Sequence, residues 1–383
     1  MKIKKLVLLA VLAVILGMFC ACEGLLNKDD EKALDLSEAV LDDEAPDFSD
    51  MKTLAEKLAW IKKYAKSDET YYLVVSEDES LAPQTLSYSG KGNITIQLIG
   101  IGGVRTIELN GTGSLFRIED GVTLVLNENI VLKGKREYIY LLVSVIGGNL
   151  ILNDGSKITG GGVSVNYGTF TMNGGTISGN TIGSPGGGVS IANGGTFTMN
   201  GGTISGNTAA TASSGGSGGG VHVTGGTFTM NGGVISGNTA PQDGGGVFIN
   251  AEGTFTMNGG IISGNTARLY GGGVFSSVNG TFTMHGGTIS GNTAFYGGGV
   301  SGGTFQKLPP VGEGQNSGII YGNGAVGNDA NGVPLQNTAL SNGYGHAVFI
   351  YAGVRDTTAG QTDRIDTTTG RGLSTSGYEP FVN

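Results

Sequence analysis

One tetrapeptide, Thr-Phe-Thr-Met, recurs through the middle of the chain at almost constant intervals. Its copies begin 27, 31, 27 and 27 residues apart, at Thr169, Thr196, Thr227, Thr254 and Thr281. A period between about 20 and 50 residues is typical of structural units that stack on one another. The sequence therefore predicts a solenoid, in which each repeat packs only against its neighbours.

Each repeat combines short β-like runs with glycine-rich turns. The first full copy reads Gly-Gly-Gly-Val-Ser-Val from residue 160, Thr-Phe-Thr-Met-Asn from 169 and Gly-Gly-Thr-Ile-Ser-Gly-Asn-Thr from 174. Glycine supplies 73 of 383 residues, but there is no Gly-x-y period and proline numbers only 8, which excludes a collagen triple helix. A hydrophobic content of 38% is also too high for a wholly disordered chain. We predict an all-β parallel β-helix with about 27 residues per coil.

Side chains alternate along a strand, so Phe170 and Met172 share one face while Thr169 and Thr171 share the other. Stacking then turns every position into a row. The apolar rows are expected to fill a narrow core, with Phe170, Phe197, Phe228, Phe255 and Phe282, the matching methionines, and Ile177, Ile204, Ile235, Ile262 and Ile289. An asparagine row is expected to hydrogen-bond from coil to coil at a turn, through Asn180, Asn207, Asn238, Asn265 and Asn292. The outer rows form a candidate binding face of Thr169, Thr171, Thr196, Thr198, Thr227, Thr229, Thr254, Thr256, Thr281 and Thr283.

Degenerate copies extend the repeat in both directions. Earlier copies occupy residues 122–134 and 150–160, and later echoes occupy 320–323 and 345–349. The repeat therefore begins near residue 94 and ends near residue 350. Roughly nine coils at ~4.8 Å per stacked strand predict a body about 40 Å long.

These motifs are similar to those of a known family. Ile-Ser-Gly-Asn-Thr-Ala at 262–267, followed by Gly-Gly-Gly-Val at 271–274, resembles the repeat of chlamydial polymorphic membrane proteins and, more closely, of repeat-rich treponemal lipoproteins. The resemblance covers about residues 53–360. It implies a right-handed parallel β-helix of the pectate-lyase-like kind, and it says little about activity. The polymorphic proteins continue into a long autotransporter barrel, which is not seen after the last repeat here, so we expect attachment by another route.

The N-terminus predicts export. Three lysines precede an apolar run at 6–19, which is typical of a secretory signal peptide and too short for a membrane-spanning helix. Residues 19–22, Phe-Cys-Ala-Cys, resemble a bacterial lipobox of the relaxed spirochaetal kind, which implies a diacylglyceryl group on Cys22. Cys20 as the acceptor would place the bulky Phe19 at the cleavage position. The family's anchor carries more than one acyl chain, which suffices for stable membrane attachment.

Composition divides the rest of the chain. Residues 22–50 are predicted to form an acidic tether. Residues 23–50 hold eleven acidic residues and two lysines, and the like charges keep the segment extended. A transient helix in this segment is the alternative. Residues 51–66 have helical apolar spacing, with Asp50 as the expected N-cap and Trp60 in the seam, and predict a helix that caps the solenoid. We assign 1–21 to the signal peptide, 67–355 to the β-helix and 356–383 to a C-terminal cap or tail.

The sequence offers little catalytic chemistry. Between residues 160 and 300 the charged residues are Asp243, Glu252 and Arg268, at unlike places in the repeat, whereas catalysis needs convergent groups. We therefore predict no enzyme, no metal site and no cofactor, and the net charge of −9 argues against nucleic acid. The alternative is a carbohydrate-binding or carbohydrate-active β-helix. The paired carboxylates of an active one would have to come from loop acids: Asp120, Glu128, Asp154, Asp329, Asp356, Asp363 and Asp366. The histidines occupy different places in their coils and are interpreted as drift in the repeat: His222, His285 and His346.

We therefore expect a non-catalytic lipoprotein of the outer membrane, displayed on the cell surface or on the periplasmic face. Its β-helix is expected to be structural or adhesive and to contact host or matrix glycans and proteins through the threonine rows. The longer interval leaves residues 208–217 as a projecting loop that adds specificity. A remote alternative is ice binding, since the threonine rows resemble the ice-binding face of insect antifreeze β-helices, and thermal hysteresis tests it.

Overall fold

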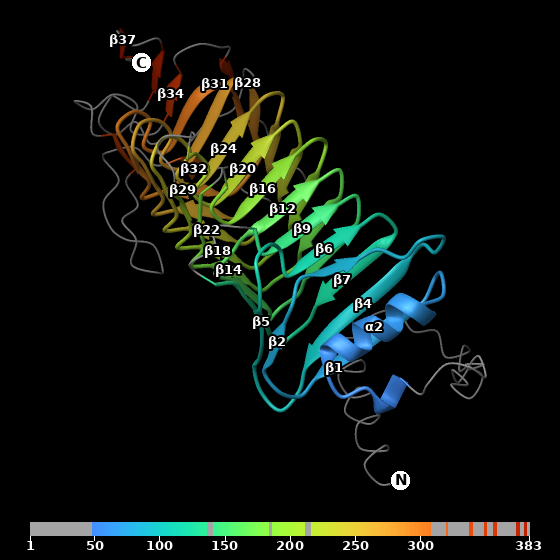
Figure 1. The fold of residues 1–383 in the computed structure, drawn as a ribbon. Coiled ribbons are helices and arrows are strands. Elements are labelled where there is room, and N and C mark those ends of the chain that lie inside the picture. Colours follow the sequence, from blue (N-terminus) through green and yellow to red (C-terminus); the bar gives the residue numbers. More distant parts are fainter. Residues whose placement is uncertain are drawn as a thin grey trace, which may run out of the picture. The chain divides into compact units, whose positions relative to one another are not determined.

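A computed structural model describes residues 48–135, 141–183, 186–210 and 216–307. It also describes the short stretches 319–320, 337–339, 348–350, 355–357, 373–375 and 379–380. These residues form a parallel β-solenoid of about eight coils, against the nine expected (Figure 1). The fold class is confirmed, with about 27 residues per turn and one short helix near the N-terminus. The predicted signal peptide, Cys22, residues 23–47 and His346 lie outside the described residues.

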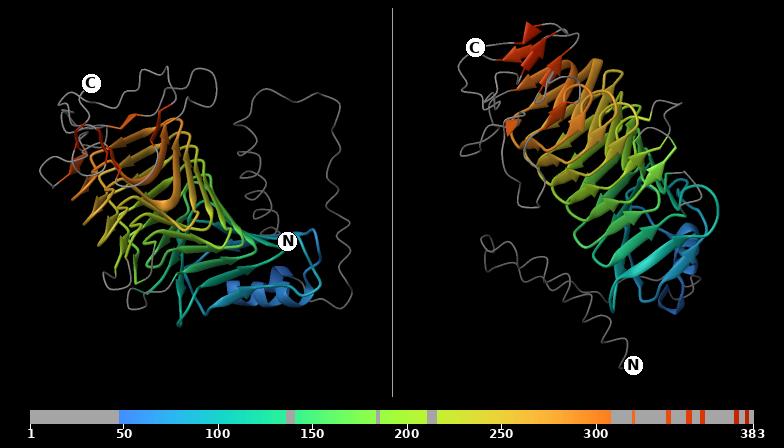
Figure 2. Two further views of the ribbon diagram at one scale, coloured as in Figure 1. Left: turned by 90° about the horizontal axis from the view of Figure 1, so that it is seen from above. Right: turned by 90° about the vertical axis from the view of Figure 1, so that its left-hand side faces the viewer.

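The largest sheet, sheet A, contains two ladders of parallel strands that join in β28 and β31. In the right-hand view of Figure 2, strands of successive coils lie side by side along the solenoid. The first ladder contains β3 (Gln84–Leu86), β6 (Phe116–Glu119), β9 (Val143–Ile146), β12 (Val163–Asn166), β16 (Val189–Ala192), β20 (Val221–Thr224), β24 (Val247–Asn250), β28 (Val274–Met284), β31 (Val300–Lys307), β34 (Val348–Ile350) and β36 (Leu373–Thr375), with β37 (Glu379–Pro380) antiparallel to β36. The second contains β1 (Thr70–Val75), β4 (Ile94–Gly100), β7 (Val122–Leu126), β10 (Asn149–Leu152), β13 (Thr169–Met172), β17 (Thr196–Met199), β21 (Thr227–Met230), β25 (Thr254–Met257), β28, β31 and β35 (Arg355–Thr357).

Two narrower sheets lie beside sheet A. Among the described residues sheet B has ten strands and sheet C has six, because sheet C begins only at β15, four coils after the start of sheet B. Sheet B contains β2 (Glu79–Leu81), β5 (Arg105–Leu109), β8 (Ile130–Lys133), β11 (Lys157–Thr159), β14 (Thr176–Ser178), β18 (Thr203–Ser205), β22 (Val234–Ser236), β26 (Ile261–Ser263), β29 (Thr288–Ser290) and β32 (Ile319–Ile320). Sheet C contains β15 (Thr181–Ile182), β19 (Thr208–Ala209), β23 (Thr239–Ala240), β27 (Thr266–Ala267), β30 (Thr293–Ala294) and β33 (Thr338–Ala339).

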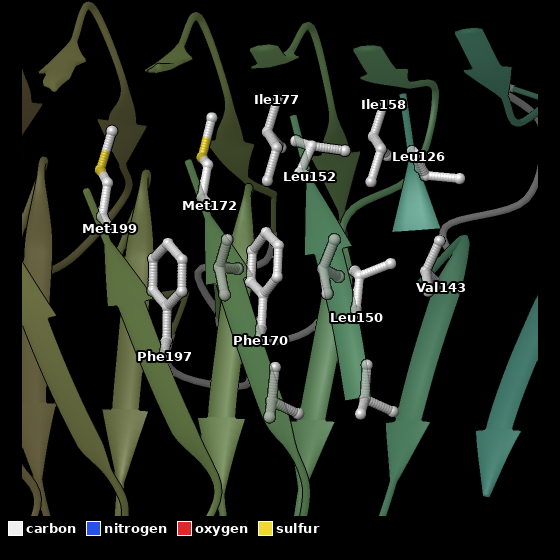
Figure 3. Close-up of a cluster of buried hydrophobic side chains, with 14 of the residues drawn as sticks. Leu126, Val143, Leu150, Leu152, Ile158, Phe170, Met172, Ile177, Phe197 and Met199 are labelled. Atoms are coloured by element: carbon white, nitrogen blue, oxygen red, sulfur yellow. The ribbon is translucent and has the colours of Figure 1, made fainter. Parts of the chain in front are cut away.

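Stacked apolar rows fill the core, as the alternation predicts. Figure 3 shows Phe170 and Phe197 side by side, with Met172 and Met199 in the neighbouring row and Leu150 and Leu152 continuing the two rows. Ring centroids in the phenylalanine row are 4.5–5.1 Å apart from Phe170 to Phe305, and the planes are nearly parallel. Burying one such side chain contributes roughly 2–3 kcal/mol, so the core row is a main source of stability.

A buried asparagine row closes one corner of the solenoid, as predicted. The side chains of Asn180, Asn207, Asn238, Asn265, Asn292 and Asn337 are fully buried. At Asn238, Nδ2 donates to Oδ1 of Asn265 at 2.9 Å and to the carbonyl of Ile204 at 3.0 Å. Its Oδ1 accepts from the backbone N–H and the Nδ2 of Asn207, at 3.0 and 2.9 Å. The amide therefore satisfies buried groups on both neighbouring coils.

Glycine is required where the Gly-Gly-Gly segment enters the first ladder. Gly244 has φ +65°, a conformation that side chains with a Cβ rarely adopt. A Cβ on Gly246 would lie 2.5 Å from the carbonyl oxygen of Gly273 on the next coil. The triplet thus lets successive backbones approach closely, which explains its recurrence in each repeat.

The helix α2 (Leu54–Tyr64) covers the N-terminal end of the solenoid (Figure 1). Leu54, Leu58 and Ile61 are buried in the same core as the first strands, and Trp60 packs against it, as predicted for the seam. Lys57 Nζ donates to the carbonyl of Val74 in β1 at 2.7 Å. The predicted cap is thus present as a helix that contacts the first coil.

The N-cap of α2 is Thr53, so the expectation of Asp50 was wrong. Thr53 Oγ1 accepts from the backbone N–H of Glu56 at 3.2 Å, and the Glu56 carboxylate accepts from the N–H of Thr53 at 3.0 Å. This reciprocal capping box satisfies two orphan donors, while Asp50 belongs to a short 3-10 turn, Phe48–Asp50. The backbone N–H groups of Thr53 and Lys52 both donate to the Glu56 carboxylate and hold its pKa below its usual value.

Candidate functional site

The structure places all ten predicted threonines in two rows on the outside of sheet A. Within β13, β17, β21, β25 and β28, each threonine pairs directly with the same position of the next coil. All ten side chains are half-buried or exposed, while the phenylalanine and methionine between them are buried. Where Thr254 stacks on Thr227, the two hydroxyl oxygens are 3.3 Å apart. The outcome is a regular array of hydroxyl and methyl groups over five coils.

An outer asparagine row borders the threonine rows, and sequence reasoning missed it. Asn173, Asn200, Asn231 and Asn258 each donate Nδ2 to Oδ1 of the preceding coil at 2.9–3.1 Å, and the row continues back to Asn153. A primary amide has two donors and an oxygen with two lone pairs. Each amide thus uses one donor and one lone pair within the row. The signal was available, because these asparagines follow Thr-Phe-Thr-Met in four successive copies of the repeat.

His285 occupies the next position of this outer row. Its backbone N–H donates to the carbonyl of Met257 at 2.8 Å, as the N–H of Asn258 does to Met230. The interpretation of His285 as a substituted asparagine position therefore agrees with the structure. It ends the amide row at its C-terminal side.

His222, interpreted from the sequence as drift in the repeat, pairs with Ser190 and Phe248 at the same position of the neighbouring coils. It lies on the outer side of β20, where Phe248 and Phe275 of the next two coils continue a ring stack, with successive centroids 4.9 and 5.3 Å apart. All three side chains are more than nine-tenths buried, although they point away from the core. Burial lowers the pKa of His222 to about 4. Tyr270 and Tyr296 lie beside this stack, with the ring centroids of Tyr270 and Phe275 5.9 Å apart. These five rings form the aromatic corner.

Asp243 lies at the same corner. Its Oδ1 accepts the backbone N–H of Tyr270 at 3.1 Å, and burial raises the carboxyl pKa from 3.8 to about 6. Glu252 and Arg268, the other charged residues of this stretch, are exposed on different turns. Residues 208–217 were expected to project as a loop, but Thr208–Ala209 forms β19 of sheet C with Ala209 buried, and residues 211–215 lie outside the described residues.

The loop acids of the carbohydrate-active alternative do not all lie within the described residues. Asp120, Glu128 and Asp154 are exposed on turns. Gly155 next to Asp154 lies against Glu128, while Asp120 lies against Gly147 at another corner. Within the described residues, no three His, Cys, Asp or Glu side chains gather in a way that could hold a metal ion. Asp329, Asp363 and Asp366 and the side chain of Asp356 lie outside the described residues.

The opposite pKa shifts at the aromatic corner predict a pH-dependent stability. The folded state favours protonated Asp243, so the contribution of this carboxyl group to the free energy of unfolding falls as pH rises from 3.8 to about 6. The folded state also favours neutral His222, so the contribution of this imidazole is present above pH 6.5 and is lost as pH falls toward about 4. Asp243→Asn keeps the acceptor for Tyr270, and we expect it to raise the free energy of unfolding at pH 7 by about 2 kcal/mol.

The gain from Asp243→Asn should vanish near pH 3.5, below both carboxyl pKa values, and urea denaturation at the two pH values measures it. Glu252→Gln removes the same charge from an exposed position and should change stability at neither pH by more than about 0.5 kcal/mol. His222→Phe continues the ring stack and should stabilise the chain in acid relative to wild type. Equal stability of wild type and Asp243→Asn at pH 7 would contradict the burial of this carboxylate.

Within the described residues, no helix is both long and apolar enough to cross a membrane. Comparisons with protein-family models, curated proteins and solved structures give no significant match to this chain. The assignment of the solenoid fold therefore depends on the strand pairing of this chain alone. The likeness to treponemal and chlamydial repeats stays an interpretation of the motifs.

Proposed function

We propose that the chain is an exported lipoprotein, attached to the bacterial outer membrane through Cys22, whose solenoid is a non-catalytic adhesive scaffold. The observation that carries the proposal is the paired threonine rows of sheet A with the amide row beside them. Hydroxyl and amide groups that repeat at one strand spacing offer many weak contacts to an extended polar partner, a glycan or a glycoprotein. A repeat scaffold adds such contacts coil by coil.

Stacking also supports a role that needs rigidity. Each coil holds its neighbours through backbone ladders, through the phenylalanine row and through the buried asparagine row. The outer groups are therefore fixed relative to one another before any partner arrives. Preorganisation of this kind reduces the entropy that binding costs.

A triple substitution tests the binding face. Thr198, Thr229 and Thr256 replaced by valine lose three hydroxyls on successive coils and keep the shape and strand preference of the side chains. If each hydroxyl contributes about 0.5 kcal/mol, binding to the best ligands of a glycan and matrix-protein panel should weaken about tenfold. The matched control is Thr203→Val with Thr288→Val in sheet B, where Val234 and Ile261 occupy equivalent positions.

Equal binding by the triple variant and the control would reject the threonine rows as the contact surface. Display is tested separately by protease treatment of intact source cells, with Cys22→Ala and a periplasmic protein as controls. Loss of the wild-type body, with survival of the periplasmic protein, supports surface display. Full protection of a body that is protease-sensitive when purified would reject surface display and favour the periplasmic face.

A further inference from the structure

A cavity of about 580 Å³ opens on sheet B, away from the threonine rows. Its lining comes from four successive coils: Glu108 of β5, Lys133 of β8 and Thr159 of β11 are paired side by side, and Gly179 follows β14 on the next coil. Gly134, Gly160 and Gly179 from the following turns expose backbone, and Lys135 completes the lining. Glycine is needed at the base, because a Cβ on Gly134 would lie 2.2 Å from the carbonyl oxygen of Gly160.

The charges of this cavity are unusual for the chain. Among the described residues, two lysines and one glutamate line it, a local excess of one positive charge in a chain of net charge −9. Lys133 Nζ lies 3.3 Å from Glu108 Oε1, and these side chains are 49% and 41% exposed. Exposed ion pairs of this kind contribute little, so Lys133 can turn toward a ligand at small cost. Among the described residues Lys135 belongs to neither of the two ion pairs, Arg117–Glu119 and Lys133–Glu108.

We propose that this cavity binds a saccharide unit that carries a carboxylate or sulfate group. The ammonium groups of Lys133 and Lys135 fit the acidic group, since charge-assisted hydrogen bonds to an anion are the stronger kind. Glu108 accepts hydrogen bonds from ring hydroxyls, and Thr159 both donates and accepts. The volume lies in the range of small-molecule sites and exceeds what a bare inorganic anion fills.

The alternation of strands explains why these groups converge. Glu108, Lys133 and Thr159 point outward because Ile107, Leu132 and Ile158 beside them are buried in the core. Along the same outer row, the later coils carry Ser178, Ser205 and Ser236 in place of the charged residues. The charged groups of the site are therefore confined to the coils in which the repeat is degenerate.

The inference deepens the proposed function, because it names a ligand class, but it rests on sheet B alone. Titration calorimetry of the full-length chain in detergent should show binding of glucuronic acid and none of glucose. N-acetylglucosamine 6-sulfate and unmodified N-acetylglucosamine form the sulfate arm, and the arm that binds identifies the acidic group. Lys133→Gln and Lys135→Gln should each weaken binding about tenfold, and added salt should weaken it further.

Lys62→Gln removes the same charge from the exposed side of α2 and should bind like wild type. Thr159→Glu places a repelling carboxylate in the cavity and should abolish binding, which gives a second variant if a lysine substitution impairs folding. Equal affinities for sodium sulfate and for the acidic sugars would overturn the saccharide assignment. Absence of binding by both acidic sugars would overturn the proposal that this cavity is a binding site. The threonine-to-valine triple variant should bind these sugars normally, so failure of the sheet A proposal is distinguishable from failure of this one.

Discussion

Asn238→Ala is expected to lower the free energy of unfolding by about 4 kcal/mol, because four buried groups lose a partner at once. These groups are the Asn207 backbone N–H, the Asn207 Nδ2, the Ile204 carbonyl and the Asn265 Oδ1. Asn207 and Asn265 are fully buried, so bulk water cannot replace the lost amide there. Urea denaturation measures the loss, and hydrogen exchange of the Asn207 amide should accelerate.

Asn231→Ala is the matched control, because it removes the same side chain from the outer row of the same coil. Its Nδ2 donates to Asn200 Oδ1 at 2.9 Å, but water can replace that partner at an exposed position. We expect a cost below about 1 kcal/mol. Similar losses for both variants would show that the buried row contributes no more to stability than the outer row.

Phe228→Ala is expected to cost about 4 kcal/mol, since it removes a fully buried ring and leaves a cavity. The ring stacks on Phe197 and Phe255 with centroids 4.8 and 4.5 Å away, so two neighbouring coils lose contact. The coils above and below remain tied by backbone ladders, which limits collapse into the space. Thermal and urea denaturation measure the change.

Thr229→Ala, the next residue on the same strand, points outward and should change stability by less than about 0.5 kcal/mol. Phe228→Leu keeps much of the volume and should cost less than the alanine variant. A small cost for Phe228→Ala, equal to that of Thr229→Ala, would mean that the phenylalanine row is not tightly packed.

The clearest predictions from the sequence concern positions that every full repeat shares. Phe228, Thr229 and Asn238 recur at one period, and identical coils stack with identical residues in register, as β17, β21 and β25 show. Which of these side chains face the core and which face the solvent follows from their alternation along a strand. The core, the outer threonine rows and the buried asparagine row could therefore be predicted from the repeat itself.

Local competition made the helix boundary harder to predict. Asp50 and Thr53 are both suitable N-caps, and the reciprocal hydrogen bonds with Glu56 decide for Thr53. The Leu54 N–H also donates to the Glu79 carboxylate in β2, 25 residues away, at 2.8 Å. This tertiary contact fixes the start of α2 against the first coil, and no local pattern contains it.

Two features were decided by the tertiary structure alone. The aromatic corner adds Tyr270 to the ring stack of His222, Phe248 and Phe275, although Tyr270 lies at a different position of the repeat from the one these three share. The cavity joins Glu108 and Lys133, whose register depends on turn lengths in degenerate coils. By itself the sequence determined the period, the sheet faces and the shared rows, because repetition forces like residues to stack. The groups that break the repeat converge only once the coils are in register, since their neighbours are set by the stacking and not by the spacing along the chain.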